Sequence, residues 1–287
     1  MITGTGMQVD TTPVDAATAA ELEAAESRAW IDLYAAAPAE WAASAGVSTR
    51  RVAGAAVLSW AVTGRRYFSR TIGLGVVEAA SASALDDVLD GYAVTGISMF
   101  LVQSQPHCLP ADWEMLLRER GLEPFDAHDR LVRGGEPAGG EIALHDERDL
   151  TVERVTRATA DEWAGFLQSV YRLDAEPWLT RLIDRPGWNQ YVVRESGTIV
   201  GARCMYVDPT GMAWLGMDGP VPGVMTTDYV PDAALCAAIV ADGIAQGVRT
   251  FHTDIEAPSA RRDTPAYDYF ASLGFSSPYT RTHWKLA

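Results

Sequence analysis

Three titratable side chains stand in line on one expected strand of this chain. The segment Phe251–Glu256 places His252, Asp254 and Glu256 at alternate positions. Because side chains of a strand alternate between its two faces, these three point the same way. Burying them together is costly unless they line a cleft. Carboxylates and imidazoles are typical general bases, so we expect Glu256 or Asp254 to accept a proton, with His252 as a relay.

The same three groups allow two other interpretations. With His283 added, they would form a histidine–carboxylate metal site. Alternatively, His252 is a structural core residue and the acids form ion pairs with arginines. The candidate arginines are Arg249, Arg261, Arg262 and Arg281. The even spacing along one strand matches no known metal-binding motif, so we assign no metal ligand.

The elements that must position these groups occur twice in the chain. Residues 72–122 and 214–275 each read as strand, helix, strand and helix, with glycines at matching places. The closing glycines follow the preceding ones by 25 residues (Gly96 to Gly121) and by 27 residues (Gly247 to Gly274). Such a repeat predicts two related α/β domains.

Local patterns give a coarse map of each half. We expect one or two helices within residues 15–45, strands at 52–62 and 66–77, and a hairpin of strands 191–195 and 198–207. A helix that opens at Pro231 or Asp232 should end near Gly247. The glycine- and proline-rich stretch 133–140 is the best linker candidate. The expected domains are therefore 1–134 and 150–287, joined by a linker at 135–149.

Composition restricts the class of protein and partner. The 287 residues are 48% apolar and 21% charged, as in a globular protein, and the formal net charge is −15. This acidity argues against nucleic-acid binding and favours a cationic partner such as a small amine. The longest apolar run has 11 residues, Val52 to Val62, too short for a membrane span. We see no secretion signal, and three scattered cysteines suggest reduced thiols in a cytoplasmic protein.

Residues 150–287 resemble the GNAT superfamily of acyl-CoA-dependent N-acyltransferases. The resemblance is carried, in order, by Gly197–Gly201, Ala213–Gly219, Gly247–Phe251, Tyr267–Phe275 and Tyr279–Trp284. Residues 50–134 are similar to a more eroded second copy. The resemblance implies an α/β fold class with two GNAT-like domains in tandem, each a twisted mixed sheet flanked by helices. The second domain would carry the site.

The family resemblance also implies a function and a donor site. The chain would transfer an acyl group, most simply from acetyl-CoA, to the amine of a small molecule. The pantetheine arm of the donor would insert between strands 212–218 and 248–256, and the following loop and helix N-terminus would take the pyrophosphate. The implied donor-binding residues are Met217, Gly219, Gly223, Thr226, Thr227, Arg261 and Arg262.

The pyrophosphate loop departs from the family pattern. The family motif Arg/Gln-x-x-Gly-x-Gly/Ala is absent, and residues 204–248 contain no Lys, Arg or His. Asp228 and Asp232 would compete with a phosphate for the same backbone N–H groups. Two further functions therefore stay open. One is a GNAT-fold enzyme that has dropped coenzyme A and works through the His252 face, and the other is a non-catalytic ligand-binding module.

The family's general acid is also replaced. Many GNAT enzymes protonate the leaving thiolate with a tyrosine four residues before the closing glycine, and Phe270 stands there in this chain. Tyr267 and Tyr269 flank that position and are the candidate acids. We expect no nucleic acid or membrane partner, and a homodimer is left open as the assembly.

Overall fold

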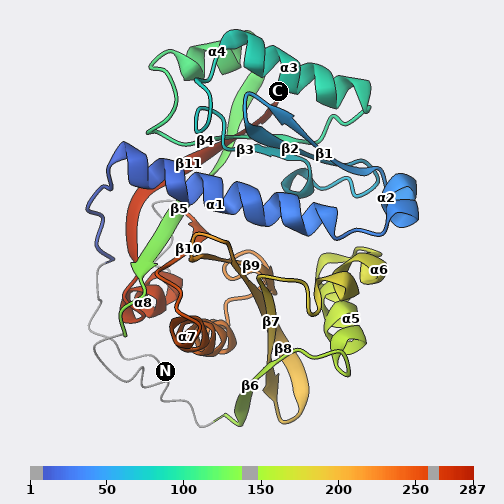
Figure 1. The fold of residues 1–287 in the computed structure, drawn as a ribbon, viewed down its shortest axis with the longest axis vertical. Coiled ribbons are helices and arrows are strands. Elements are labelled where there is room, and N and C mark those ends of the chain that lie inside the picture. The colour runs from blue at the N-terminus through green and yellow to red at the C-terminus, as the bar shows by residue number, and fades with distance from the viewer. Residues whose placement is uncertain (1–8, 138–147, 258–264) are drawn as a thin grey trace. The chain divides into compact units, whose positions relative to one another are not determined.

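The computed structural model describes residues 9–137, 148–257 and 265–287, and these divide into two compact units (Figure 1). The N-terminal unit comprises Pro13–Arg130 together with Tyr279–Ala287, and the C-terminal unit comprises Leu131–Pro278 together with Met1–Thr12. The last residues of the chain therefore belong with its first half. The expected limits were 1–134 and 150–287. In the structure the first boundary falls after Arg130, and Tyr279–Ala287 joins the N-terminal unit.

The N-terminal unit contains a mixed sheet in which β1, β2 and β3 are antiparallel neighbours, β3 and β4 are parallel, and β11 is antiparallel to β4. Its elements are α1 (Ala16–Ala35), α2 (Ala39–Ala45), β1 (Val47–Val52), β2 (Ala55–Trp60), β3 (Arg70–Ile72), α3 (Ala82–Val94), β4 (Leu101–Ser104), α4 (Trp113–Glu119), β5 (Leu122–Gly134) and β11 (Ser276–Leu286). Strands β5 and β11 each continue into the other unit.

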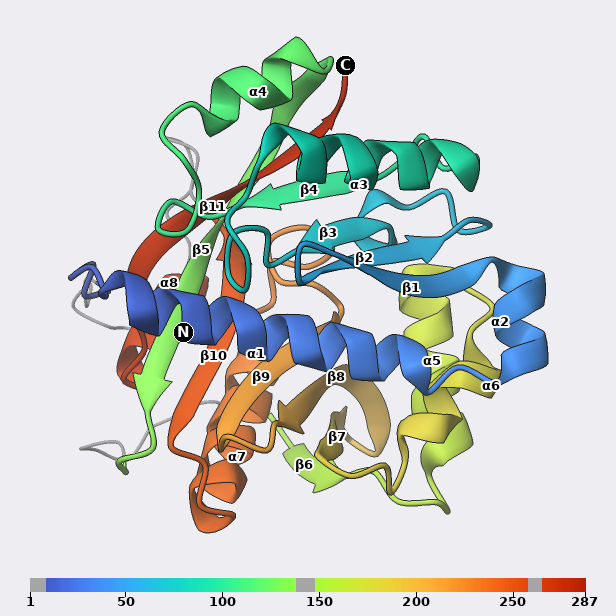
Figure 2. The same ribbon diagram turned by 45° about the horizontal axis from the view of Figure 1, so that its top comes forward.

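Helices cover both faces of the N-terminal strands. Helix α1 lies on one face, and α3 and α4 lie on the other (Figure 2). The two long helices begin at side-chain caps, because Asp15 accepts a hydrogen bond from the Thr18 N–H at 2.7 Å and Ser81 accepts one from the Ala84 N–H at 3.2 Å. Apolar residues of α3 and α4 pack with those of β2 and β4 into one core, which includes Trp284 of β11.

The C-terminal unit repeats the same order of elements. Strands β6 to β9 are antiparallel neighbours, and β10 is parallel to β9. Its elements are β6 (Leu150–Arg154), α5 (Ala160–Tyr171), α6 (Glu176–Leu179), β7 (Trp188–Glu195), β8 (Thr198–Val207), β9 (Met212–Gly219), α7 (Val230–Ala245), β10 (Thr250–Glu256) and α8 (Pro265–Ser272). Helices α7 and α8 lie on one face of these strands and α5 and α6 on the other (Figure 1).

Most of the expected elements are confirmed, including both strand–helix–strand–helix repeats. The β7–β8 hairpin turns at Ser196 and Gly197, which both have positive φ (48° and 84°), as a two-residue turn requires. The strand expected at 66–77 is wrong in extent, because only Arg70–Ile72 is extended and a short 3-10 turn precedes it. None of the described helices is both long and apolar enough to cross a membrane.

The expected linker at 133–140 is partly wrong. Its first two residues belong to β5, where the buried Arg133 donates to the carbonyl of Leu273 at 2.7 Å. Residues 138–147 lie outside the described part of the chain. The glycine-rich composition predicted the start of the linker wrongly. Strand β5 extends to Gly134, and Arg133 within it bonds the residue that follows α8.

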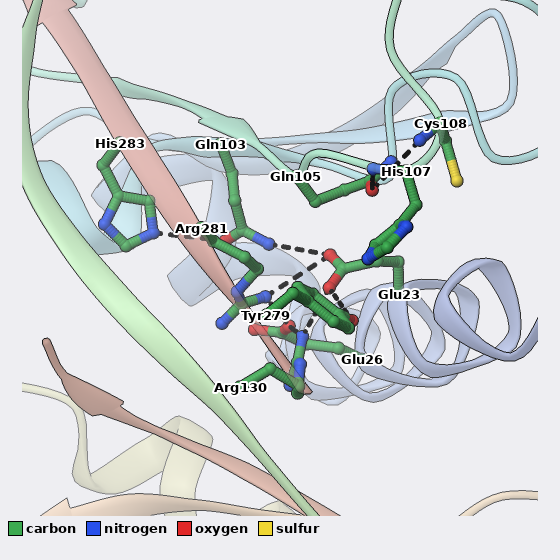
Figure 3. Close-up of polar contacts among 10 residues, drawn as sticks. All are labelled: Glu23, Glu26, Gln103, Gln105, His107, Cys108, Arg130, Tyr279, Arg281 and His283. Atoms are coloured by element: carbon green, nitrogen blue, oxygen red, sulfur yellow. Dashed lines mark hydrogen bonds and ion pairs between the residues drawn. The ribbon is translucent and has the colours of Figure 1, made fainter. Parts of the chain in front are cut away.

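A fully buried ion cluster holds α1 against the strands of the N-terminal unit (Figure 3). Glu23 and Glu26 of α1 meet Arg130 of β5 and Arg281 of β11, and all four side chains are 0% exposed. Arg130 Nη2 lies 2.9 Å from Glu23 Oε1, which also accepts the Tyr279 hydroxyl at 2.8 Å. Two acids and two bases cancel in charge, as a group of ions shielded from water requires.

We predict that Arg130→Met destabilises the protein by about 3–5 kcal/mol, because it leaves two glutamates facing one arginine without water. The measurement is the free energy of unfolding in urea. Arg120→Met is the matched control, since Arg120 is partly exposed and pairs at 2.5 Å with the exposed Asp86, so this variant should lose at most about 1 kcal/mol. Equal losses in the two variants would contradict the prediction.

Candidate active site

The parallel strands β9 and β10 of the C-terminal unit are paired over only three residue pairs. The pairs are Thr250 with Met212, Phe251 with Ala213, and His252 with Trp214. Both strands run on beyond the last pair, to Gly219 and Glu256. At the first step past it, the Thr253 hydroxyl bridges the strands by donating to the carbonyl of Leu215 at 2.9 Å. The carboxyl ends of this strand pair therefore lack the usual backbone ladder, at the place where α/β sheets bind ligands.

A β-bulge shapes the free end of β9. Between the pairs Ala202–Gly219 and Cys204–Gly216, two residues of β9, Met217 and Asp218, stand opposite the single residue Arg203 of β8. Met217 has a φ of 55°, the left-handed conformation that a bulge can impose on one residue. The Tyr171 hydroxyl of α5 donates to the carbonyl of Asp218 and holds the bulge from the other side.

The bulge places Asp218 beside a buried guanidinium. Arg203 is 2% exposed, and its Nη2 lies 2.9 Å from Asp218 Oδ2 and 2.9 Å from Asp232 Oδ1. Asp232 comes from the first turn of α7, and the Tyr269 hydroxyl of α8 donates to its other oxygen. Four elements thus meet at one cation, which lies behind the open ends of β9 and β10.

The electrostatics of this cluster leave a net negative charge. Burial alone would lower the pKa of Arg203, but Asp218 and Asp232 outweigh it and hold that pKa above its ordinary value. Burial, opposed by Arg203, raises the pKa of Asp218 to about 7, and Asp232 and Asp254 add to the rise. Asp218 Oδ1 is buried and has no hydrogen-bond partner among the described residues. This oxygen can accept a proton at neutral pH.

The aspartates in and after the loop before α7 repel an anion less than the sequence suggested, because both form ion pairs. Asp228 pairs with Arg148, whose Nη1 lies 2.8 Å from its Oδ2. Asp232 pairs with Arg203, so each of the two aspartates expected to repel a pyrophosphate is matched by an arginine. Neither arginine is close to the loop in sequence, so local sequence patterns do not reveal these two ion pairs.

The expected donor-binding residues take different places. Met217 and Gly219 lie on the free end of β9, and a Cβ on Gly219 would come within 2.7 Å of Leu167 Cδ2, so packing against α5 also accounts for this glycine. The N–H of Gly223 donates to the carbonyl of Thr226, whose hydroxyl accepts from the N–H of Asp228. The remaining expected residues are Thr227, which is exposed, and Arg261 and Arg262, which lie outside the described residues.

The line of titratable groups on β10 lies along the same free edge. His252 is fully buried, and Asp254 and Glu256 are half-buried on the part of the strand beyond the last β9 pair. Asp254 influences the pKa of Asp218, so the two carboxylates are close. Within the described chain, His252, Asp254 and Glu256 do not converge as metal ligands, and the ligand cluster that includes His283 draws on other residues.

The two candidate tyrosines of α8 differ in environment. Tyr269 is buried, and burial together with Asp232 raises its pKa well above the ordinary value. Tyr267 is half-buried against the core of the C-terminal unit. Phe270, which occupies the family position of the general acid, is buried and packs on Phe275, with ring centroids 5.2 Å apart. A general-acid role for either tyrosine stays a prediction.

The residues that sequence reasoning missed are Arg203 and Asp218. A signal for Arg203 was present, because a lone arginine sits at a buried position in the apolar stretch of β8. A charged residue there demands a partner. The identity of the partner was not readable from sequence, since it depends on a bulge in the next strand.

Comparison with solved structures identifies the fold. A GCN5-related N-acetyltransferase from Kribbella flavida is 15% identical, covers 94% of both chains and superposes with a TM-score of 0.58. One from Sphaerobacter thermophilus is 16% identical over 71% of this chain and 65% of its own, with a TM-score of 0.50. A conserved protein of unknown function from Staphylococcus epidermidis is 10% identical, over 84% of this chain and 95% of its own, with a TM-score of 0.52. No protein-family model and no curated protein matches the chain. The expected tandem GNAT-type α/β fold is confirmed.

The raised pKa of Asp218 predicts a pH-dependent stability. An acid with a higher pKa in the folded chain than in the unfolded one, where it is about 4, stabilises the fold below that lower value. This contribution is lost as the pH rises toward about 7. Relative to wild type, Asp218→Asn should therefore gain unfolding free energy between pH 4 and pH 7, by at most about 1.4 kcal/mol per pH unit. Urea denaturation at several pH values measures this, and a constant difference would contradict it.

Proposed function

We propose that the C-terminal unit transfers a short acyl group from an acyl thioester of coenzyme A, most simply acetyl-CoA, to the amine of a small molecule. The observation that carries the proposal is the early end of the β9–β10 pairing in a GNAT fold, after His252 and Trp214. The GNAT superfamily inserts the pantetheine arm of its donor at this point of the sheet. The other features of the site support the same activity.

The residues present fit the donor in two respects. Beyond Leu215, β9 has no backbone ladder with β10, so the backbone groups on that edge that are not bonded to β8 or to the Tyr171 hydroxyl can bond an extended amide-containing arm. Arg148 pairs with Asp228 in the loop before α7, and Arg203 pairs with Asp232 in its first turn, which lessens the repulsion of a phosphate at the N–H groups of the helix N-terminus. Bound there, the coenzyme would supply the acyl group as an activated thioester.

The charge of the site fits the acceptor. Arg203 is outnumbered by Asp218 and Asp232, and Asp254 adds a further carboxylate nearby. A primary amine is a cation in water, and a net negative site attracts it. The amine must lose a proton before it can attack a carbonyl carbon, and Asp218 Oδ1 is an unpartnered oxygen that can accept this proton.

The raised pKa makes Asp218 a better base than an ordinary carboxylate. A base is most effective when its pKa lies near the working pH, and burial brings the pKa of Asp218 to about 7. Asp254 and Glu256 remain the alternative bases expected from the sequence. Tyr267 and Tyr269 remain the candidates for protonating the leaving thiolate.

Donor binding can be tested with acetyl-CoA alone. We expect millimolar acetyl-CoA to raise the melting temperature, because a ligand that binds only the folded state stabilises it. Arg148→Met should weaken binding about 2- to 5-fold by uncovering Asp228 beside the loop. The double variant with Asp228→Asn should restore wild-type affinity. The absence of any thermal shift in the wild type would overturn the proposal.

The base can be identified by comparing three variants in an assay that follows thiol release from acetyl-CoA with a panel of small amines. Asp218→Asn should lower kcat by about 10²- to 10⁴-fold while leaving the acetyl-CoA thermal shift in place. Asp254→Asn and Glu256→Gln test the other two carboxylates, and Asp161→Asn is the control on the exposed first turn of α5. Full activity of Asp218→Asn, with loss in Glu256→Gln, would move the base to Glu256.

A further inference from the structure

A second group of titratable side chains lies in the N-terminal unit, outside the proposed acyl-transfer site. Asp126 and His128 are two residues apart on β5 and so share one face, and His283 comes from β11. Their potential ligand atoms all lie within 4.8 Å of one another. His283 Nδ1 is 2.6 Å from Asp126 Oδ1, and His128 Nε2 is 3.7 Å from Asp126 Oδ2.

The two ring nitrogens of His283 face different acceptor oxygens. Gln103 Nε2 donates to Glu23 Oε2 at 3.1 Å, and a carboxylate that pairs with Arg130 and Arg281 only accepts. This fixes the orientation of the Gln103 amide, so its oxygen Oε1 faces His283 Nε2 at 3.4 Å (Figure 3). A ring proton on Nε2 would donate to this amide oxygen, whereas a ring proton on Nδ1 would donate to Asp126 Oδ1.

The tautomer with its proton on Nε2 leaves two acceptors face to face. Nδ1 of His283 then presents a lone pair to the carboxylate oxygen of Asp126 at 2.6 Å. Two acceptors at this separation repel unless a cation is shared between them. A second proton on the ring or a metal ion would satisfy both, and a third donor atom from His128 stands on the same side.

The surroundings match those of a metal site. Metal-binding histidines typically donate their other ring N–H to an outer partner, and Gln103 Oε1 stands where it would accept such a bond from His283 Nε2. The carboxylate of Asp126 is likewise oriented by the Tyr67 hydroxyl, which donates to its Oδ2. Asp126 and His128 are 16% and 19% exposed, so an ion can reach the site from solvent.

We propose that Asp126, His128 and His283 bind a divalent transition-metal ion, for which zinc is the best match. Two imidazole nitrogens and one carboxylate form a common donor set for zinc, with a further position left for water. Because the ligands come from β5 and β11, the ion would tie the last strand of the chain to the N-terminal unit. This inference is independent of the proposed acyl transfer.

Zinc binding to the full-length protein, freed of any affinity tag and treated with chelator, tests the proposal. We expect a single equivalent by titration calorimetry, a rise in melting temperature, and a low-coordination visible spectrum when cobalt replaces zinc. Asp126→Asn and His128→Gln should each weaken zinc binding at least about 100-fold, and Gln103→Met about 10- to 100-fold. His107→Gln, elsewhere in the same unit, is the control and should bind as wild type.

Circular dichroism of each variant confirms that it is folded before its zinc affinity is compared. The proposal is overturned if wild type binds no zinc, or if Asp126→Asn and His128→Gln bind it as tightly as wild type. It is also overturned if nitrogen NMR of the zinc-equilibrated protein shows both ring nitrogens of His283 protonated, since a second proton would then occupy the place assigned to the ion.

Discussion

Burial of the Arg203 guanidinium requires carboxylates to reach it from other elements. An unpaired charge at that depth would cost far more than the fold can tolerate. Asp218 reaches it because a bulge adds a residue to β9, and Asp232 reaches it because α7 begins just behind the strand ends. Tyr269 completes the group from α8. The position of α7 relative to β8 and β9 is therefore set by charge as well as by apolar packing.

The same constraint gives the site its chemical character. Arg203 needs two carboxylates to be well bonded, and this second acid leaves the cluster negative. The pKa of Asp218 rises as a consequence of its burial, and its second oxygen stays unpartnered among the described residues. The ion cluster thus supports the fold with one oxygen of Asp218 and leaves the other for the proposed proton transfer. Structural and catalytic roles need not compete in such an arrangement.

The two units use one frame with different buried polar groups. Both contain a parallel strand pair formed by a strand–helix–strand connection, β3 with β4 and β9 with β10. In the N-terminal unit the buried acids come from a helix and the arginines from strands, and their charges cancel. In the C-terminal unit one arginine faces two aspartates. The shared frame explains why the repeat indicates the fold, whereas the unequal charge distinguishes the unit proposed to act on an amine.

Local pattern was sufficient for much of the fold. The glycine spacing of the two repeats, the Ser196–Gly197 turn and the helix limits of α7 follow from backbone preferences that act over a few residues. Alternation along β10 likewise placed His252, Asp254 and Glu256 on one strand. These features need no knowledge of distant parts of the chain, which is why they could be predicted.

The partners of buried charges were decided only by tertiary structure. Glu23 and Arg281 are 258 residues apart in sequence, and Arg203 and Asp232 are 29 apart, yet each pair shares one buried site. His283 was associated with the His252 strand from sequence, but β11 brings it to Asp126 instead. A pattern of residue types indicates that a buried charge needs a partner of opposite charge. Which partner it meets depends on strand pairing and on a one-residue bulge, and both result from packing of the whole unit.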